Sequence, residues 1–141
     1  MKIIFLDIDG VLNRDSTKEK FRDFTGIDVY LANKFLTWLE GKDYDIVLSS
    51  TWRFEESFMA ELRRNGLSWI AETAMLHQYG LNRGWEIEGY LDANPVTNYV
   101  ILDDLHPGMF LIHQRPQLVQ TSPVHGLRDK DLKRMEKLLA D

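Results

Sequence analysis

Apolar residues along the chain fall into two alternating patterns. Continuous apolar runs, typical of strands that are covered on both faces of a sheet, occupy 2–7, 45–49 and 99–103, and weaker runs occupy 69–71 and 117–121. Between them, apolar residues recur at helical spacing and predict helices that start at Val29, near Phe54, near Arg83 and before Leu132. Asp28 is placed to cap the first helix, and Gly41 and Asn65-Gly66 to end the first and second.

Strands that alternate with helices predict an α/β fold, because parallel neighbours need a crossover segment between them. We expect a three-layer, Rossmann-like parallel sheet of about five strands, flanked by helices. In such sheets, ligands bind beyond the carboxyl ends of the strands. The residues that follow the apolar runs are therefore the candidates for chemistry.

Composition limits the class of protein further. A chain of 141 residues, 44% apolar and 11% aromatic, is long enough for one core and is not a disordered chain, so we expect one domain over 1–141. The absence of cysteine excludes disulfides and thiolate chemistry. The first apolar run is too short for a signal peptide or a membrane span, and we expect a cytoplasmic protein with no membrane contact.

Net charge sets expectations for partners. With 17 basic and 22 acidic residues the chain carries −5, which is unfavourable for tight, non-specific binding of nucleic acid. Brief contact with a nucleic-acid end remains compatible with this charge. No stable protein partner is evident from the sequence.

The first strand ends in a pair of acids, Asp7 and Asp9, followed by Gly10. Side chains alternate in extended chain, so the two carboxylates point the same way and repel each other unless a cation lies between them. Oxygen ligands of this kind suit Mg²⁺. The alternative is that Asp7 only ends the strand and Asp9-Gly10 forms a turn.

Further polar groups follow the other strands. Hydroxyl groups at Ser49, Ser50 and Thr51 follow the second, and Asp103-Asp104 ends the run at 99–103. Arg83 starts a predicted helix. Taken singly, the hydroxyls could cap a helix, the arginine could be solvated and the acids could form a turn. Together they indicate a magnesium and phosphate site.

These four segments resemble the four motifs of the haloacid dehalogenase (HAD) superfamily of phosphohydrolases. The first motif is matched by 7–11, the second by the strand that ends in Ser49-Ser50, the third by Arg83, and the fourth by 102–104. The order and spacing agree from Lys2 to about Thr121. The stretches 50–53, 83–87 and 99–104 resemble a small capless group that includes phosphatase-like domains of RNA-repair proteins.

The resemblance implies a role for each motif residue. Asp7 would attack phosphorus and become an aspartyl phosphate, and Asp9 would act as general acid and then as base. Mg²⁺ would be held by the Asp7 carboxylate, the Asp9 backbone carbonyl and Asp103 or Asp104. Ser49 or Ser50 would bind the phosphoryl oxygens, and Arg83 would balance their charge. The sequence leaves open which serine and which acid of the fourth motif take these roles.

Two departures from the family pattern concern residues outside the nucleophile. Arg83 stands where many relatives have lysine, and Thr121-Ser122 follows the last strand where related sequences often carry an acid. The segment 14–26 carries four basic residues among acids and is interpreted as a solvated loop, with a small substrate flap as the alternative. The four tryptophans, at 38, 52, 69 and 85, are interpreted as core residues, with platforms for base stacking as the alternative. Trp52 and Trp85 lie closest to the motif residues.

The function predicted from this reasoning is a Mg²⁺-dependent phosphomonoesterase. The intervals between motifs are too short for a separate cap domain, so an open site could admit bulky phosphates such as a polynucleotide end. One alternative is a catalytically silent phosphate-binding module of the same fold. A receiver-type phospho-acceptor domain is the other, but it would need an acceptor aspartate at the end of a middle strand and a lysine near the last one, and the strands at 45–49 and 117–121 offer neither.

Overall fold

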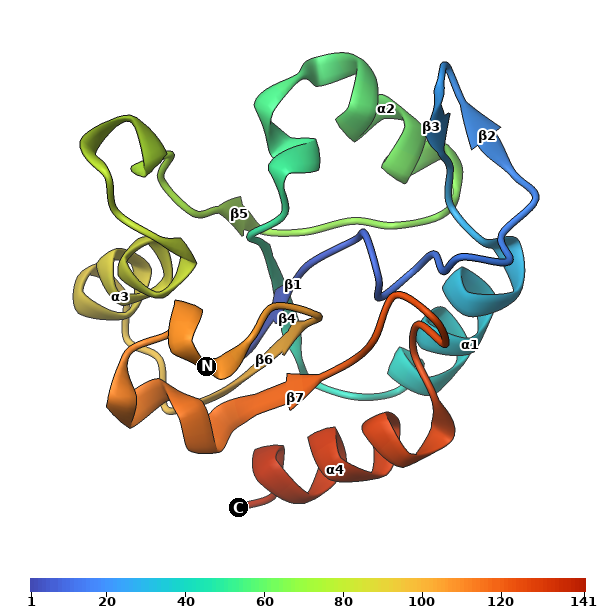
Figure 1. Ribbon diagram of the computed structural model, residues 1–141. Helices are drawn as coiled ribbons and strands as arrows, with labels where there is room; N and C mark the ends of the chain where they lie inside the picture. The colour runs from blue at the N-terminus through green and yellow to red at the C-terminus, as the bar shows by residue number, and fades with distance from the viewer.

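The computed structural model describes all residues, 1–141, and is built around one parallel sheet (Figure 1). The strands lie side by side in the order β5-β4-β1-β6-β7, and every neighbouring pair is parallel. Their bounds are β1 Lys2–Leu6, β4 Asp45–Leu48, β5 Ala71–Glu72, β6 Asn98–Asp103 and β7 Leu118–Gln120. The chain starts at the central strand β1 and adds β4 and β5 on one side of it. It then crosses over to add β6 and β7 on the other side, so the strand order reverses at β1.

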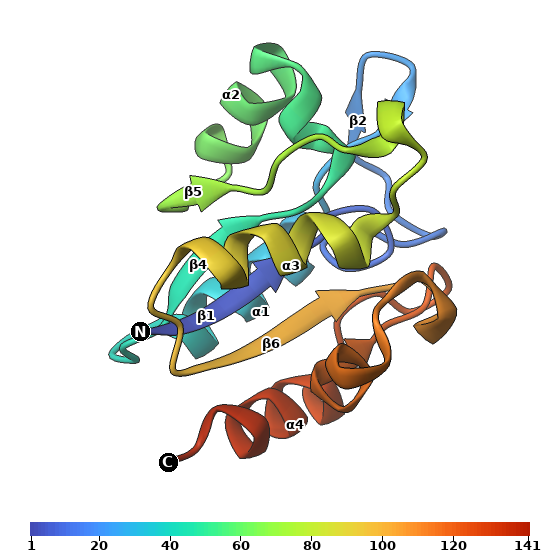
Figure 2. The same ribbon diagram turned by 90° about the vertical axis from the view of Figure 1, so that its left-hand side faces the viewer.

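Four α-helices cover the sheet; they are α1 Val29–Leu39, α2 Glu56–Arg64, α3 Arg83–Ala93 and α4 Asp129–Leu139. Seen from the side, α3 lies in front of the strands and α1 lies behind them (Figure 2). The larger apolar core lies on the face of the sheet opposite α3. It joins alternate β1 residues to α1, α2 and α4, through residues such as Ile4, Phe35 and Met135. The smaller core packs Ile3 and Phe5 of β1 against Ile87 of α3. The sheet is thus buried on both faces, as the continuous apolar runs predict.

Short segments complete the chain. A two-stranded hairpin, β2 Lys20–Phe21 and β3 Phe24–Thr25, follows the first motif. Four 3-10 helices are present: η1 Thr51–Phe54, η2 His77–Tyr79, η3 Pro107–Met109 and η4 Ile112–Gln117. Only the hairpin and α1 separate β1 from β4, and only η1, α2, β5 and η2 separate β4 from α3. Neither interval forms a separate cap domain.

Local signals in the sequence set the helix ends. The Asp28 side chain accepts a hydrogen bond from the Leu31 amide and caps α1. Gly66, just past the end of α2, has φ of +88°, a left-handed conformation that suits glycine. The Asn82 side chain accepts from the Trp85 amide and caps α3, so that Arg83 is the first residue of that helix.

The predicted fold class is confirmed, with three local corrections. The strand expected at 69–71 lies at Ala71–Glu72, so its start was placed two residues too early. The segment 14–26 is not a plain solvated loop, because it contains the hairpin, whose aromatic residues pack on α2. Trp85 is 47% exposed on the first turn of α3, so its assignment to the core was wrong.

None of the helices has both the length and the apolar character that a membrane span requires.

Candidate active site

Strand register brings Asp7 and Asp103 to the same level at the carboxyl end of the sheet. Leu6 of β1 lies opposite Leu102 of β6, and each of these leucines is followed by an aspartate. The Asp7 amide continues the ladder by donating to the Leu102 carbonyl at 3.0 Å. The two acids are 96 positions apart in the chain (103 − 7), yet parallel pairing makes them neighbours.

Asp104 joins these two acids in one group. Carboxylate oxygens of Asp7, Asp103 and Asp104 all lie within 4.8 Å of one another, and we call these three residues the acidic cluster. Asp7 and Asp103 are buried, and Asp104 is half-buried. Three carboxylates at this distance repel one another strongly when all are ionised.

Arg83 is the cation that reaches the acidic cluster. Its Nη1 lies 2.6 Å from Asp103 Oδ2 and 3.3 Å from Asp7 Oδ1. The Asn82 cap starts α3 at this place and so directs the first side chain of the helix toward the strand ends. One guanidinium therefore faces three carboxylates, and the cluster keeps an excess of negative charge.

The pKa values of the acidic cluster reflect this excess. Burial, with the nearby charges of Asp103 and Asp104, raises the pKa of Asp7 well above its usual value despite the opposing effect of Arg83. Burial and Asp103 likewise raise the pKa of Asp104. Burial acts to lower the pKa of Arg83, but Asp7 and Asp103 outweigh it and the net shift is upward. A divalent cation with oxygen ligands is the group that would relieve this repulsion, so the residues present fit Mg²⁺.

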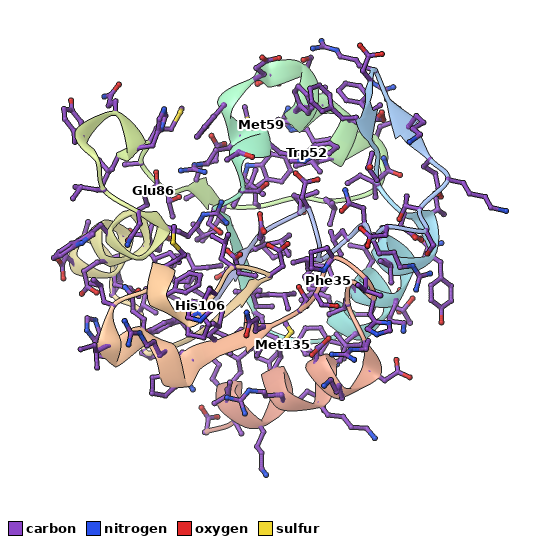
Figure 3. The ribbon with its side chains drawn as sticks, viewed as in Figure 1. Phe35, Trp52, Met59, Glu86, His106 and Met135 are labelled. Carbon is purple, nitrogen blue, oxygen red and sulfur yellow. The ribbon has the colours of Figure 1, made fainter.

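Asp9 has different neighbours from the acidic cluster. Both of its carboxylate oxygens lie 3.2 Å from Nε1 of Trp52, and its Oδ1 also accepts from Nδ2 of Asn13 at 2.9 Å. Asn13 is fixed in turn, because its Oδ1 accepts from the Gly10 amide. Figure 3 shows Trp52 below α2, near the hairpin. The Asp9 side chain is thus held away from the cluster and stays accessible to solvent.

Gly10 allows the chain to turn directly after Asp9, close to Asp104 of the acidic cluster. Its φ is +77°, and a Cβ atom at this position would lie 2.2 Å from Oδ2 of Asp104. Its carbonyl accepts a hydrogen bond from the Thr121 hydroxyl at 2.6 Å, which ties the end of β7 to the first motif. Thr121 therefore supports the loop in a chain that lacks the acid common at the next position.

Ser49 and Ser50 are both fully buried. The Ser49 hydroxyl donates to the Leu6 carbonyl at 3.2 Å, next to Asp7, while the Ser50 hydroxyl accepts from the Trp52 amide and caps η1. The capping interpretation is therefore confirmed for Ser50. Thr51, between the second motif and Trp52, lines a cleft together with Asp9 and Asp104.

Arg53 holds the turn after β4 from inside the protein. Its Nη1 donates to the carbonyls of Ser49 and Ser50 at 2.7 and 2.8 Å. Its Nη2 forms a buried ion pair with Glu86 of α3 at 2.9 Å, and Figure 3 shows Glu86 on the α3 side of the molecule. Through this pair, the second motif and the helix that carries Arg83 are fixed relative to each other.

The structure thus brings Arg83 into contact with Asp7 and Asp103, gathers Asp104 into the same cluster, and places Asp9 beside them on separate partners. Sequence reasoning did not predict the supporting roles of Asn13, Trp52, Arg53 and Thr121, although it placed Trp52 close to the motif residues. Trp52 and Arg53 fall within the quoted stretch 50–53, but nothing in their spacing shows which atoms they contact. Asn13 and Thr121 gave no signal, because a single amide or hydroxyl is common in any loop.

The chain matches a known protein family over most of its length. The model of the family described as "HAD domain in Swiss Army Knife RNA repair proteins" matches residues 3–132. This span contains every residue of the candidate site. No curated protein and no solved structure gives a significant match to the chain.

Proposed function

The chain belongs to the family of HAD domains in Swiss Army Knife RNA repair proteins, and from this premise we propose that it is a Mg²⁺-dependent phosphomonoesterase. Asp7 is the proposed nucleophile and forms an aspartyl phosphate, which water then hydrolyses. The substrates we propose are phosphorylated nucleic-acid ends or other bulky phosphate monoesters. The family description names RNA repair, and an end-processing phosphatase would suit that setting.

The acidic cluster and its one arginine are the observation that carries the proposal. A protein that only needed a stable fold would gain nothing from three carboxylates within 4.8 Å of one another at the end of its central strands. Groups with strongly perturbed pKa values in such a place indicate a functional site. Asp7 lies at the point of strand reversal, where ligands bind in open α/β sheets.

Mg²⁺ would be held by the carboxylates of Asp7 and Asp104 and by the Asp9 backbone carbonyl, and it would neutralise charge as an anionic nucleophile approaches an anionic phosphate. Both oxygens of Asp103 already have partners, Arg83 at Oδ2 and the Leu105 amide at Oδ1. This favours Asp104 over Asp103 as the fourth-motif ligand. Asp103 would instead hold Arg83 in place.

Asp9 is the proposed general acid and base. The indole N–H of Trp52 and the amide of Asn13 fix its carboxylate at the cleft, separate from the acidic cluster. From there it can protonate the leaving oxygen and afterwards take a proton from water. Ser49 or Ser50, by a change of hydrogen-bond partner, would bind the phosphoryl oxygens, and Arg83 would balance their charge.

Hydrolysis of p-nitrophenyl phosphate with and without Mg²⁺ tests the activity. We expect turnover that requires the cation and is abolished in Asp7→Asn, because a neutral amide cannot attack phosphorus. Asp92→Asn, which changes an exposed acid on α3, is the matched control and should keep full activity. Phosphate binding without turnover would contradict the proposal and favour a silent binding module.

Calorimetric titration with Mg²⁺ tests the metal assignment separately. We expect about one site, and we expect it to be lost in Asp104→Asn. Asp103→Asn should weaken it through loss of the Arg83 contact. Unchanged binding in both variants would overturn the assignment of the fourth motif.

A further inference from the structure

A cleft of about 620 Å³ opens beside the proposed reaction centre. Asp9 and Asp104 line it, and four aromatic rings contribute to its walls, from Phe24, Trp52, Phe54 and Phe58. We call this hollow the aromatic cleft. Because the proposed general acid Asp9 faces it, the group that leaves phosphorus would occupy it.

The β2–β3 hairpin carries an aromatic side chain, Phe24, whose exposed position contributes little to the core of the fold. Phe24 on β3 is 57% exposed, and among the aromatic rings it packs only against Phe58 of α2, with ring centroids 5.6 Å apart. Its hairpin neighbour Phe21 is more buried and contacts both Phe58 and Trp52. In Figure 1 the hairpin stands beside α2. The hairpin is thus anchored by Phe21 and presents Phe24 to the cleft.

The charges around the aromatic cleft restrict what can fill it. Asp15 and Glu55 line it in addition to the site acids, and the only basic side chain in its wall, Arg14, is already paired with Asp28 at 3.2 Å. Glu55 is paired with Arg22 at 3.4 Å, which leaves Asp9, Asp15 and Asp104 as the carboxylates of the wall without a basic partner there. A second phosphate group would meet net negative charge there. The occupant therefore carries no negative charge apart from the phosphate that reacts.

The polar groups of the cleft favour a ring that carries N–H donors. The hydroxyls of Thr25 and Thr51 and the carboxylates of Asp15 and Glu55 can accept hydrogen bonds beside the aromatic walls. Aromatic side chains stack on planar rings, and nucleobases are planar rings with N–H groups on their edges. A volume of about 620 Å³ lies within the range of small-molecule sites, roughly 300–1,000 Å³.

We propose that the aromatic cleft binds the base of a single terminal nucleoside, stacked on Phe24, while its phosphate reaches Asp7. This rests on the proposed phosphatase function and adds a specificity residue to it. The cleft binds one nucleoside, and the acidic residues around it repel further phosphodiester groups. Recognition is by stacking, so it tolerates different bases.

The test compares substrates that differ only by the base. We expect kcat/KM for adenosine 5′-monophosphate to exceed that for ribose 5-phosphate about tenfold or more. In Phe24→Ala the ratio should fall below about threefold, while ribose 5-phosphate is hydrolysed as before. Phe24→Trp should keep the preference. Tyr79→Ala, an exposed aromatic outside the cleft, is the control and should change nothing.

A binding measurement separates failure of this proposal from failure of the phosphatase. Adenosine, which has no phosphate, should shift the amide NMR signals of Phe24 and Phe58 in the wild-type protein and shift them much less in Phe24→Ala. Adenosine binding without any hydrolysis would refute the phosphatase and leave the base site standing. Hydrolysis with equal kcat/KM for both phosphates and no adenosine binding would overturn the base site alone. A higher kcat/KM for phosphotyrosine than for the nucleotide would also overturn it.

Discussion

Among the places where the molecule buries charge, the acidic cluster and the Arg53–Glu86 pair differ most. Arg53 and Glu86 lie 2.9 Å apart, and the remaining donors of Arg53 reach the carbonyls of Ser49, Ser50, Thr73 and Ala74. Glu86 also accepts from the Leu76 amide. Each member of this pair therefore lies beside a side chain of opposite charge, and hydrogen bonds to the backbone satisfy most of its remaining polar atoms.

The acidic cluster has the opposite character. Three carboxylates share one guanidinium, and the pKa values of Asp7 and Asp104 rise because burial and mutual repulsion disfavour their charges. Burial also lowers the pKa of Arg53, but Glu86 partly offsets the shift. Satisfied buried charge thus holds this fold together, whereas the unsatisfied buried charge of the acidic cluster marks a candidate ligand site.

The largest expected effect on stability comes from breaking the satisfied pair. Arg53→Met leaves Glu86 buried without a counter-charge and should lower the free energy of unfolding by about 3–5 kcal/mol, which is a fall in Tm of about 10 °C or more. Thermal unfolding followed by circular dichroism measures this. Replacing both partners, Arg53→Met with Glu86→Gln, should recover part of the loss, because no lone charge is left buried.

A surface pair provides the matched control. Arg63 and Glu56 lie 2.7 Å apart but are both exposed, so Arg63→Met should cost less than about 1 kcal/mol. Equal losses in Arg53→Met and Arg63→Met would show that the buried pair is not the support we describe.

The next effect concerns the position of Asp9. Trp52→Phe keeps an aromatic ring but removes the N–H that contacts both carboxylate oxygens, so Asp9 loses one of its two fixed partners. We expect kcat to fall about tenfold, with a larger fall for substrates whose poor leaving group needs protonation. Steady-state kinetics on p-nitrophenyl phosphate and on an alkyl phosphate would show this split.

Trp69→Phe is the control for that substitution. Trp69 also donates its indole N–H to a carboxylate, Glu72 at 3.0 Å, and it does not line the aromatic cleft. Its replacement should leave both rates unchanged. A uniform fall for both leaving groups in Trp52→Phe would mean that Trp52 acts through packing and not through Asp9.

The smallest expected effect is on stability and concerns Asp7, in the acidic cluster, where removing a charge should have the opposite result from Arg53→Met. The pKa of Asp7 is raised in the folded state, so the cost of ionising Asp7 destabilises the folded protein at neutral pH. This penalty decreases as the pH falls through the raised pKa and is absent below the ordinary pKa of an aspartate. With divalent cations removed by a chelator, Asp7→Asn should therefore raise the Tm at pH 7. The difference from wild type should shrink in acid.

Saturating Mg²⁺ should reverse this order. The wild-type protein gains stability from any cation that binds only the folded state, and Asp7→Asn does not. Differential scanning calorimetry at pH 7 and pH 5 measures both effects. A lower Tm for Asp7→Asn in the chelator would contradict the account of an overcharged cluster.

These contrasts also show what sequence can predict. The strands β1, β4 and β6 were predictable because burial on both faces leaves long apolar runs, and the acids that follow them were predictable because parallel strands end at one edge. The hairpin was missed, since two-residue strands carry no period. The roles of Trp52 and Arg53 were missed because each depends on contacts between distant segments, which residue type alone does not specify.

The most direct test of the central claim is to find where phosphate attaches. Asp9→Asn keeps the nucleophile and a carbonyl oxygen for the Trp52 N–H, but it removes the base that activates water, a loss of about 10²–10⁴-fold in the second step. p-Nitrophenolate leaves without protonation, so a phosphoenzyme should accumulate. Acid quenching followed by mass spectrometry should then show one added phosphate on Asp7. Phosphate on Ser49, Ser50 or a histidine, or undiminished turnover in Asp7→Asn, would contradict the account.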